Sequence, residues 1–127
     1  MIDHVSIECA DLGRAIGFYD AVLPTLGFAR LVTREATAGY GKRYPEFWVN
    51  LRERGDSPAT SGFHVALRCA DTDAVQAFHA AALAAGGASD GAPGPRPASA
   101  VGYFAAFIKD PDGNRVEAVT FVKEDGK

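Results

Sequence analysis

The stretch HVSIECADL, residues 4–12, recurs sixty positions later as HVALRCADT, residues 64–72. The match continues at the same offset in three further pairs: Phe18 with Phe78, Leu23 with Leu83, and Gly27 with Gly87. A molecule built from two copies of one unit has a pseudo-two-fold axis, and side chains that both copies direct inward can meet at that axis. Both copies begin with a histidine, so the repeat predicts that His4 and His64 contribute to one site.

Length, composition and charge limit the class of protein. The chain has 127 residues, of which 47% are hydrophobic and 23% charged, and this suits a single globular domain over residues 1–127. The formal net charge of -3 argues against a nucleic-acid partner. No apolar run approaches the roughly 20 residues that cross a bilayer, and the N-terminus lacks a secretion signal. We expect a cytoplasmic protein that acts on a small-molecule substrate, without nucleic acid or membrane.

Two cysteines, Cys9 and Cys69, occupy equivalent positions of the repeat. Their symmetry allows a disulfide, but two buried, reduced thiols are the expectation for a cytosolic protein.

The first unit predicts a strand, a helix and further strands. Apolar residues alternate over residues 2–9, which predicts a strand with His4, Ser6 and Glu8 on the face opposite its apolar side. Asp11 is a candidate N-cap for a helix whose apolar positions recur at helical spacing: Ala15, Phe18, Tyr19 and Val22. Strands are expected over residues 28–34 and 46–52, with a hairpin or mobile loop over residues 38–43.

The second unit repeats this order. His64, Ala66 and Arg68 share one face of its first strand, and Asp71 caps the following helix. Residues 88–100 are rich in Pro, Gly, Ala and Ser, which predicts a loop with room for one short strand. Strands over residues 103–109 and 115–122 flank the tight turn DPDGN, residues 110–114. The two modules are expected at residues 1–55 and 62–123.

Glu117 stands in the apolar run VEAV, where a carboxylate needs a partner because burying an unpaired charge is costly. Two imidazoles and one carboxylate would suit a divalent metal and leave coordination positions open for substrate. Plainer interpretations remain open: His4 exposed on its strand, His64 bonded to backbone in the core, and Glu117 exposed or paired with Arg68 or Arg115.

Three motifs resemble the vicinal oxygen chelate superfamily, which includes glyoxalase I, the fosfomycin and bleomycin resistance proteins and the extradiol dioxygenases. They are the opening IDHVSIECADL with FYD in the helix, the restart FHVAL, and the ending FIKDPDGNRVEAV. The resemblance covers nearly the whole chain. It implies an α+β fold of two βαβββ modules forming an open, cupped mixed sheet with helices outside, and it implies a homodimer.

The same resemblance implies that His4, His64 and Glu117 hold a divalent metal ion, which could be zinc, nickel, manganese or iron. Glyoxalase I enzymes add a glutamate on the last strand of the first module, and Glu46 is the candidate here. Either Glu46 or a metal-bound hydroxide would serve as the catalytic base.

Further residues are candidates for substrate binding. Trp48 and Tyr103 could form an apolar wall, and Tyr103 could donate a proton or hydrogen bond to a substrate oxygen. Arg96 could bind an anionic group. Arg68 could bind substrate or form an ion pair with Glu8, its counterpart in the repeat.

The expected function is therefore a glyoxalase-like metalloprotein that chelates neighbouring oxygens of a small substrate, with lyase or isomerase chemistry. The alternative is a metal-free, drug-binding protein of the bleomycin resistance type that uses Trp48, Tyr103 and Phe104. A thiol transferase or dioxygenase fits less well. The fosfomycin transferases place an arginine soon after the last ligand, whereas the next basic residue here is Lys123. The dioxygenases generally need more than one module pair.

Overall fold

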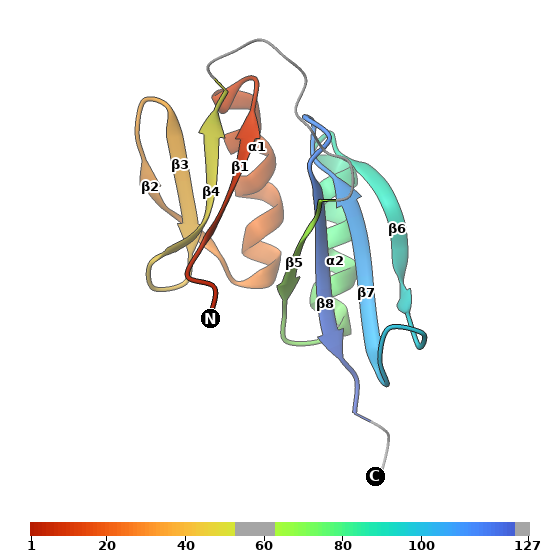
Figure 1. Ribbon diagram of the computed structural model, residues 1–127. Helices are drawn as coiled ribbons and strands as arrows, with labels where there is room; N and C mark the ends of the chain where they lie inside the picture. The colour runs from red at the N-terminus through yellow and green to blue at the C-terminus, as the bar shows by residue number, and fades with distance from the viewer. Residues whose placement is uncertain (53–62, 124–127) are drawn as a thin grey trace.

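The computed structural model describes residues 1–52 and 63–123, and these residues form two similar units (Figure 1). The first unit contains β1 (Val5–Cys9), α1 (Leu12–Val22), the 3-10 helix η1 (Leu23–Leu26), β2 (Ala29–Thr33), β3 (Thr37–Gly41) and β4 (Pro45–Leu51). The second unit contains β5 (Val65–Arg68), α2 (Thr72–Ala84), β6 (Ala88–Pro95), β7 (Tyr103–Lys109) and β8 (Arg115–Phe121).

The two units have the same strand topology. One sheet has the order β1-β4-β3-β2 and the other the order β5-β8-β7-β6. In each sheet the first strand pairs in parallel with the last, and the remaining pairs are antiparallel. The prediction of an α+β fold from two βαβββ modules with open mixed sheets is confirmed. The expected module boundaries at residues 55 and 62 lie outside the described residues.

Both helices begin at the predicted caps. The Asp11 side chain accepts a hydrogen bond from the backbone N–H of Arg14 at 3.0 Å, and Asp71 does the same for Ala74 at 2.9 Å. These bonds satisfy backbone donors that a helix start leaves unpaired. In α1 the buried residues are the predicted ones: Ala15, Phe18, Tyr19 and Val22.

The packing of the helices sets the direction of the two sheets. Helix α1 packs on β3 and β4, and α2 packs on β6, β7 and β8. The helices also pack on each other, and α2 contacts η1. Since each helix covers one face of its own sheet and the helices meet, the uncovered faces of the two sheets point away from each other (Figure 1).

The DPDGN turn joins the second module to the first. Asp112 Oδ1 accepts hydrogen bonds from the backbone N–H of Ala10 at 2.9 Å and from Arg14 Nη2 at 3.0 Å. Asn114 Nδ2 donates to the backbone oxygen of Glu8 at 2.8 Å. Gly113 has a φ of 89°, a conformation that favours glycine. The turn therefore holds the junction between β1 and α1, and it fixes the two modules relative to one another.

Two segments differ from expectation. Residues 88–100 were predicted as a loop with room for one short strand, and the strand found there, β6, extends over Ala88–Pro95 and pairs with β7. A strand rich in Pro and Gly is tolerated there because β6 is the outer strand of its sheet and its register shifts twice.

Residues 38–43 were predicted as a hairpin or mobile loop, but most of them belong to β3. Gly39 lies in that strand beneath Trp48, where an added Cβ would come within 2.8 Å of the indole ring.

Cys9 and Cys69 are buried and are present as free thiols. Burial, followed by the nearby charges of Asp112 and Asp110, raises the pKa of the Cys9 thiol to about 11. Burial also raises the pKa of Cys69. Both sulfurs are therefore protonated at neutral pH, which makes them poor nucleophiles.

Within residues 1–52 and 63–123, neither helix is long and apolar enough to cross a membrane.

Candidate metal and substrate site

The predicted site residues fall on two surfaces, one for each sheet. The first face lies on the β1-β4-β3-β2 sheet, and we define it by His4, Glu46 and Trp48. The pairing of β1 with β4 sets Ser6 beside Trp48, so residues of the same parity on these two strands share this face. The second face, on the β5-β8-β7-β6 sheet, carries the other candidates: His64, Arg68, Arg96, Tyr103 and Glu117. Its register sets Ala66 beside Glu117 and Glu117 beside Phe107, with these side chains opposite α2.

Glu117 is the centre of the second face. Only 1% of this residue is exposed. Its Oε1 lies 3.0 Å from His64 Nε2, and its Oε2 accepts a hydrogen bond from the Tyr103 hydroxyl. The ring N–H of His64 is the donor in the first contact, because an ionised carboxylate can only accept. The partners that a buried carboxylate requires are therefore supplied by His64 and Tyr103, which were both predicted as site residues.

Tyr103 is held in its protonated form. The hydrogen bond to Glu117, with smaller contributions from burial and from the carboxylate charge, raises the pKa of Tyr103 to about 12. The phenol is therefore a hydrogen-bond donor throughout the neutral range. The His64 side chain is 49% exposed, so its ring is accessible from solvent although it contacts a buried carboxylate.

Aromatic rings and guanidinium groups extend this cluster across the second face. The Arg68 guanidinium lies 4.6 Å from the centre of the Phe121 ring, and Phe121 packs edge-on against Tyr103 at 5.3 Å. The Arg96 guanidinium lies 5.4 Å from the centre of Phe107. His64 is 6.3 Å from the same ring. Six side chains of this surface are thus connected by ring contacts around Glu117.

Phe107 and Phe121 were not among the predicted site residues. The signal was available, because both share strand parity with Tyr103 and Glu117 in the predicted strands of the last hairpin. The proposed ion pair between Glu8 and Arg68 does not form, since Arg68 lies over Phe121 instead.

The first face has a different composition. His4 Nδ1 lies 2.7 Å from Asp3 Oδ1, and both side chains are more than half exposed. The Arg34 guanidinium lies 5.7 Å from the Trp48 ring. Glu46 is half-buried. This face therefore carries the imidazole of His4, the indole of Trp48 and the carboxylates of Asp3 and Glu46.

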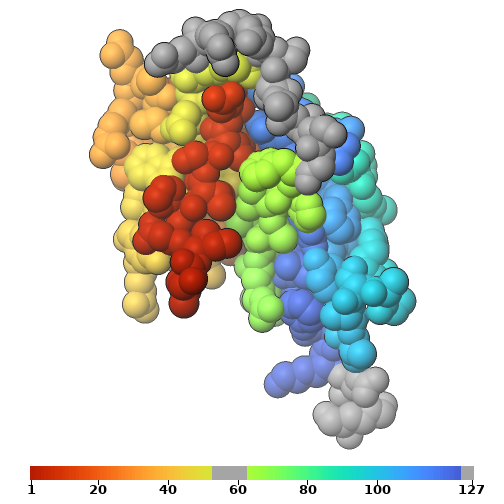
Figure 2. Space-filling view, viewed as in Figure 1, coloured from red at the N-terminus to blue at the C-terminus, as the bar shows by residue number. Residues whose placement is uncertain are grey.

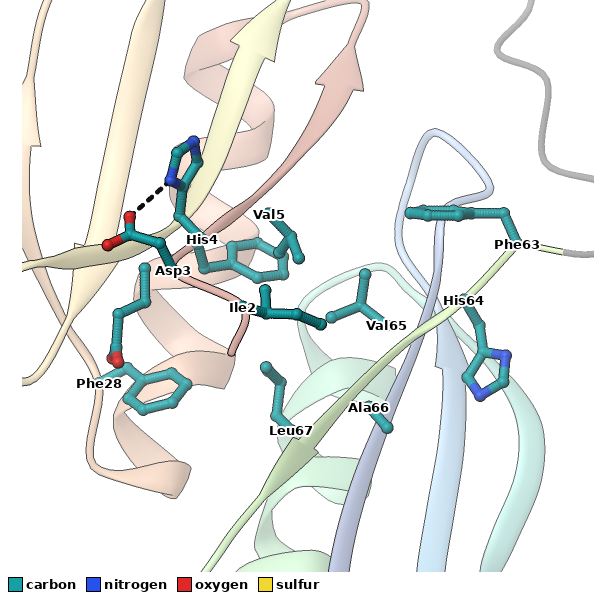
Figure 3. Close-up of a pocket in the computed structure, with 12 residues that line it drawn as sticks. Ile2, Asp3, His4, Val5, Phe28, Phe63, His64, Val65, Ala66 and Leu67 are labelled. Carbon is teal, nitrogen blue, oxygen red and sulfur yellow. Dashed lines mark hydrogen bonds and ion pairs between the residues drawn. The ribbon is translucent and has the colours of Figure 1, made fainter.

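A groove of about 450 Å³ separates the two surfaces. It runs between the neighbouring edges of β1 and β5, which the space-filling view shows in red and green (Figure 2). Most of its lining is apolar, including the exposed side chains of Ile2 and Phe63. The rings of His4 and His64 point to opposite sides of this groove (Figure 3).

One chain therefore brings together two of the three predicted ligands. His64 and Glu117 meet, whereas His4 faces away from them, because the packed helices turn the two open faces apart. Among residues 1–52 and 63–123, no group of three His, Cys, Asp or Glu side chains is arranged to hold a metal ion.

Comparison with solved structures finds the same architecture. A glyoxalase/bleomycin resistance protein from Albidiferax ferrireducens T118 is 33% identical, with a TM-score of 0.81 over 92% of this chain and 96% of that one. A glyoxalase/bleomycin resistance protein/dioxygenase family enzyme from Burkholderia phytofirmans PsJN is 18% identical, with a TM-score of 0.75 over 95% of this chain and 98% of that one.

A V278E mutant of glyoxalase I from Zea mays also matches, with 23% identity and a TM-score of 0.71. That match covers 91% of this chain and 44% of the maize protein. Proteins of curated function yield no match to this chain. The family model of the Glyoxalase/Bleomycin resistance protein/Dioxygenase superfamily matches residues 1–118. This chain therefore belongs to that superfamily.

Proposed function

We propose that the protein is a glyoxalase-like metalloprotein that binds a small substrate through two neighbouring oxygens and carries out lyase or isomerase chemistry. His64 and Glu117 of one copy, with His4 of a second copy, would hold a divalent metal ion. The single observation that carries the proposal is the contact between His64 and Glu117 on an open face of the sheet.

The chemistry of these two donors suits a metal. Imidazole nitrogen and carboxylate oxygen are both ligands that divalent ions such as zinc accept in proteins. Nε2 of His64 and Oε1 of Glu117 are 3.0 Å apart. Ligation through Nε2 would require the tautomer of His64 that carries its proton on Nδ1.

The proposal needs a homodimer, because His4 of the same chain faces away. The first and second faces derive from a duplicated unit with the same strand order. A two-fold pairing that sets the first face of one copy against the second face of the other would create two equal sites. Such pairing would also cover apolar side chains beside the groove, such as Ile2 and Phe63, which are 80% and 46% exposed.

The metal, when bound, would supply Lewis acidity that stabilises negative charge developing on a substrate oxygen. The chain would supply the proton chemistry around it. Tyr103, kept protonated by Glu117, would donate a hydrogen bond to a substrate oxygen. Glu46 would accept a proton as the general base, and Trp48 would exclude water from the site.

A metal-free binding protein is the competing function, and one observation favours it. Both oxygens of Glu117 already have partners within a single chain, so this carboxylate does not require a metal to remain buried. The rings of Phe107, Phe121 and Tyr103 would then bind a flat ligand directly.

Elemental analysis of protein purified without chelator separates the two functions. We expect about one divalent ion per chain, and we expect its loss in His64→Ala and in Glu117→Gln. His79→Ala is the matched control, because His79 lies on α2 and bonds to Ser89 at 2.8 Å. A wild-type protein without metal that still binds an aromatic ligand would support the metal-free function instead.

A further inference from the structure

The repeat gives residues of one sheet counterparts in the other, and the counterpart of Glu117 is Trp48. Ser6 and Ala66 occupy equivalent positions of the repeat. In the first sheet the parallel pairing of β1 with β4 sets Ser6 beside Trp48. In the second sheet the parallel pairing of β5 with β8 sets Ala66 beside Glu117. The first face therefore carries an indole at the position where the second face carries its buried carboxylate.

The neighbouring strands show the matching exchange of a large side chain for a small one. In the second sheet β7 sets Phe107 beside Glu117. In the first sheet β3 sets Gly39 beside Trp48. An added Cβ at Gly39 would lie 2.8 Å from Cζ3 and 2.9 Å from Cε3 of the indole, so only a glycine leaves room for this ring. The large ring of the first face thus stands on β4, the strand that pairs with β1, whereas Phe107 stands one strand further from β5.

Trp48 accompanies His4 wherever the first face is placed. The two parallel strand pairs have the same register, so His4 and Trp48 are related through the backbone as His64 and Glu117 are. The latter two side chains lie 3.0 Å apart. A site that takes His4 from a second copy of the chain therefore takes Trp48 from that copy as well. The ring is half-buried on Gly39, so it presents a preformed apolar surface.

An indole and a carboxylate at this position have different chemistry. The indole N–H is only a donor, and it offers no lone pair to a metal ion. Trp48 therefore adds no fourth protein ligand to two imidazoles and one carboxylate, and the remaining coordination positions stay open for substrate oxygens. The part of the substrate next to those oxygens would meet the apolar ring, and aromatic rings bind other flat apolar groups favourably.

We propose that Trp48 of the second copy determines the specificity of the shared site. The substrate carries a flat apolar group, an aromatic ring or a conjugated chain, directly beside its two neighbouring oxygens. The inference rests on the proposed function, because it takes the metal ion and His4 of the second copy as given. It goes beyond that function in naming the class of substrate and the residue that selects it.

Two hydroxamates test the proposed class of substrate: benzohydroxamate and acetohydroxamate. Both bind a metal ion through two neighbouring oxygens, and they differ in carrying a phenyl ring or a methyl group. Their affinities are measured by isothermal titration calorimetry on zinc-loaded protein, with zinc-free protein as the blank. We expect benzohydroxamate to bind about tenfold more tightly than acetohydroxamate. Only benzohydroxamate should quench the fluorescence of Trp48, the single tryptophan of the chain.

Variants show whether the indole is responsible for this preference. Trp48→Leu should reduce the preference for benzohydroxamate about tenfold, and its zinc content should stay that of wild type. Trp48→Phe keeps a flat ring and should retain most of the preference. Tyr44→Leu is the control, because Tyr44 is a 51% exposed aromatic residue in the turn between β3 and β4, and the preference should not change. Thermal unfolding of each variant shows that it is folded.

The outcomes separate this inference from the proposed function. Wild-type protein that binds zinc but has the same preference as Trp48→Leu would overturn the inference and leave the metal centre in place. Loss of zinc in Trp48→Leu would also overturn it, because the indole would then hold the site together instead of selecting the substrate. Wild-type protein that binds no zinc would reject the metal centre, and the inference with it.

Discussion

Glu117 illustrates how a carboxylate remains buried in an apolar strand. Its Oε2 accepts the Tyr103 hydroxyl, and its Oε1 contacts His64. In Tyr103→Phe, Oε2 loses this donor while the ring stays in place. A buried polar group left without its partner costs about 1–3 kcal/mol, so we expect the free energy of unfolding in urea to fall by this amount.

Tyr44→Phe is the control for this prediction. Tyr44 is 51% exposed and has no hydrogen-bond partner in the described part of the chain, so its hydroxyl should contribute almost nothing. Equal stability of Tyr103→Phe and wild type would show that the hydroxyl does not hold Glu117.

Asp110 gives a prediction that depends on pH. Burial raises the pKa of this carboxyl, while hydrogen bonds from Asn114 and Tyr19 act in the opposite direction. The Tyr19 hydroxyl donates to Asp110 Oδ2 at 2.7 Å, and its own pKa is raised, mainly by burial, so it stays protonated. In Tyr19→Phe the folded-state pKa of Asp110 should therefore rise further.

The sign of the effect follows from linkage. A bond that lowers the folded-state pKa of a carboxyl contributes stability above that pKa and loses it as pH falls through it. Tyr19→Phe should be less stable than wild type by about 1–2 kcal/mol near pH 7, and the difference should shrink as pH falls into the titration range of Asp110. Urea unfolding across this range measures it. A difference that is constant with pH would show that the hydroxyl acts only through packing.

At the scale of the element, strand β3 needs a glycine at position 39 because Trp48 and Pro45 pack directly against it. An added Cβ at Gly39 would lie 2.8 Å from Cζ3 of Trp48 and 3.0 Å from Cβ of Pro45. Gly39→Ala should therefore displace the indole, and overpacking of this kind costs about 1–3 kcal/mol. Trp48 is the single tryptophan of the chain, so a shift of its fluorescence maximum reports the displacement directly.

Gly17→Ala is the matched control for Gly39→Ala. Gly17 lies in α1, and an added Cβ there would meet nothing within 4 Å. Alanine favours a helix over glycine by about 0.5–1 kcal/mol, so this variant should be slightly more stable, with unchanged fluorescence. Unchanged fluorescence in Gly39→Ala as well would mean that β3 adjusts instead of Trp48.

The elements differed in how well local sequence predicted them. Both helices were predicted because Asp11 and Asp71 cap them and their apolar residues recur at helical spacing. Strand β6 was predicted only as a possible short strand within a loop, because Ala88–Pro95 has the composition of a loop. Its strand conformation depends on pairing with β7, a contact between distant residues that local composition does not encode.

For the whole molecule, alternation along the first strand of each module predicted that His4 and His64 lie opposite the apolar face of their strands. His64 and Glu117 were predicted as ligands of one site, and their side chains lie 3.0 Å apart. Alternation does not determine where a face points relative to the other module. That direction is set by the packing of α1 on α2 and by the hydrogen bonds of Asp112 and Asn114. For this reason His4 and His64, which the repeat predicts in one site, do not meet within a single chain.

The separation of His4 from His64 leads to a prediction about mixed subunits. If the metal site is shared between copies, neither His4→Ala nor His64→Ala alone should bind metal. In a dimer containing one chain of each variant, one site receives His64 from the first chain and His4 from the second. Unfolding the two variants together and refolding them should therefore restore metal binding, measured by elemental analysis after desalting. If each site were built within one chain, every chain in the mixture would lack one histidine, and the mixture would bind no more metal than the separate variants.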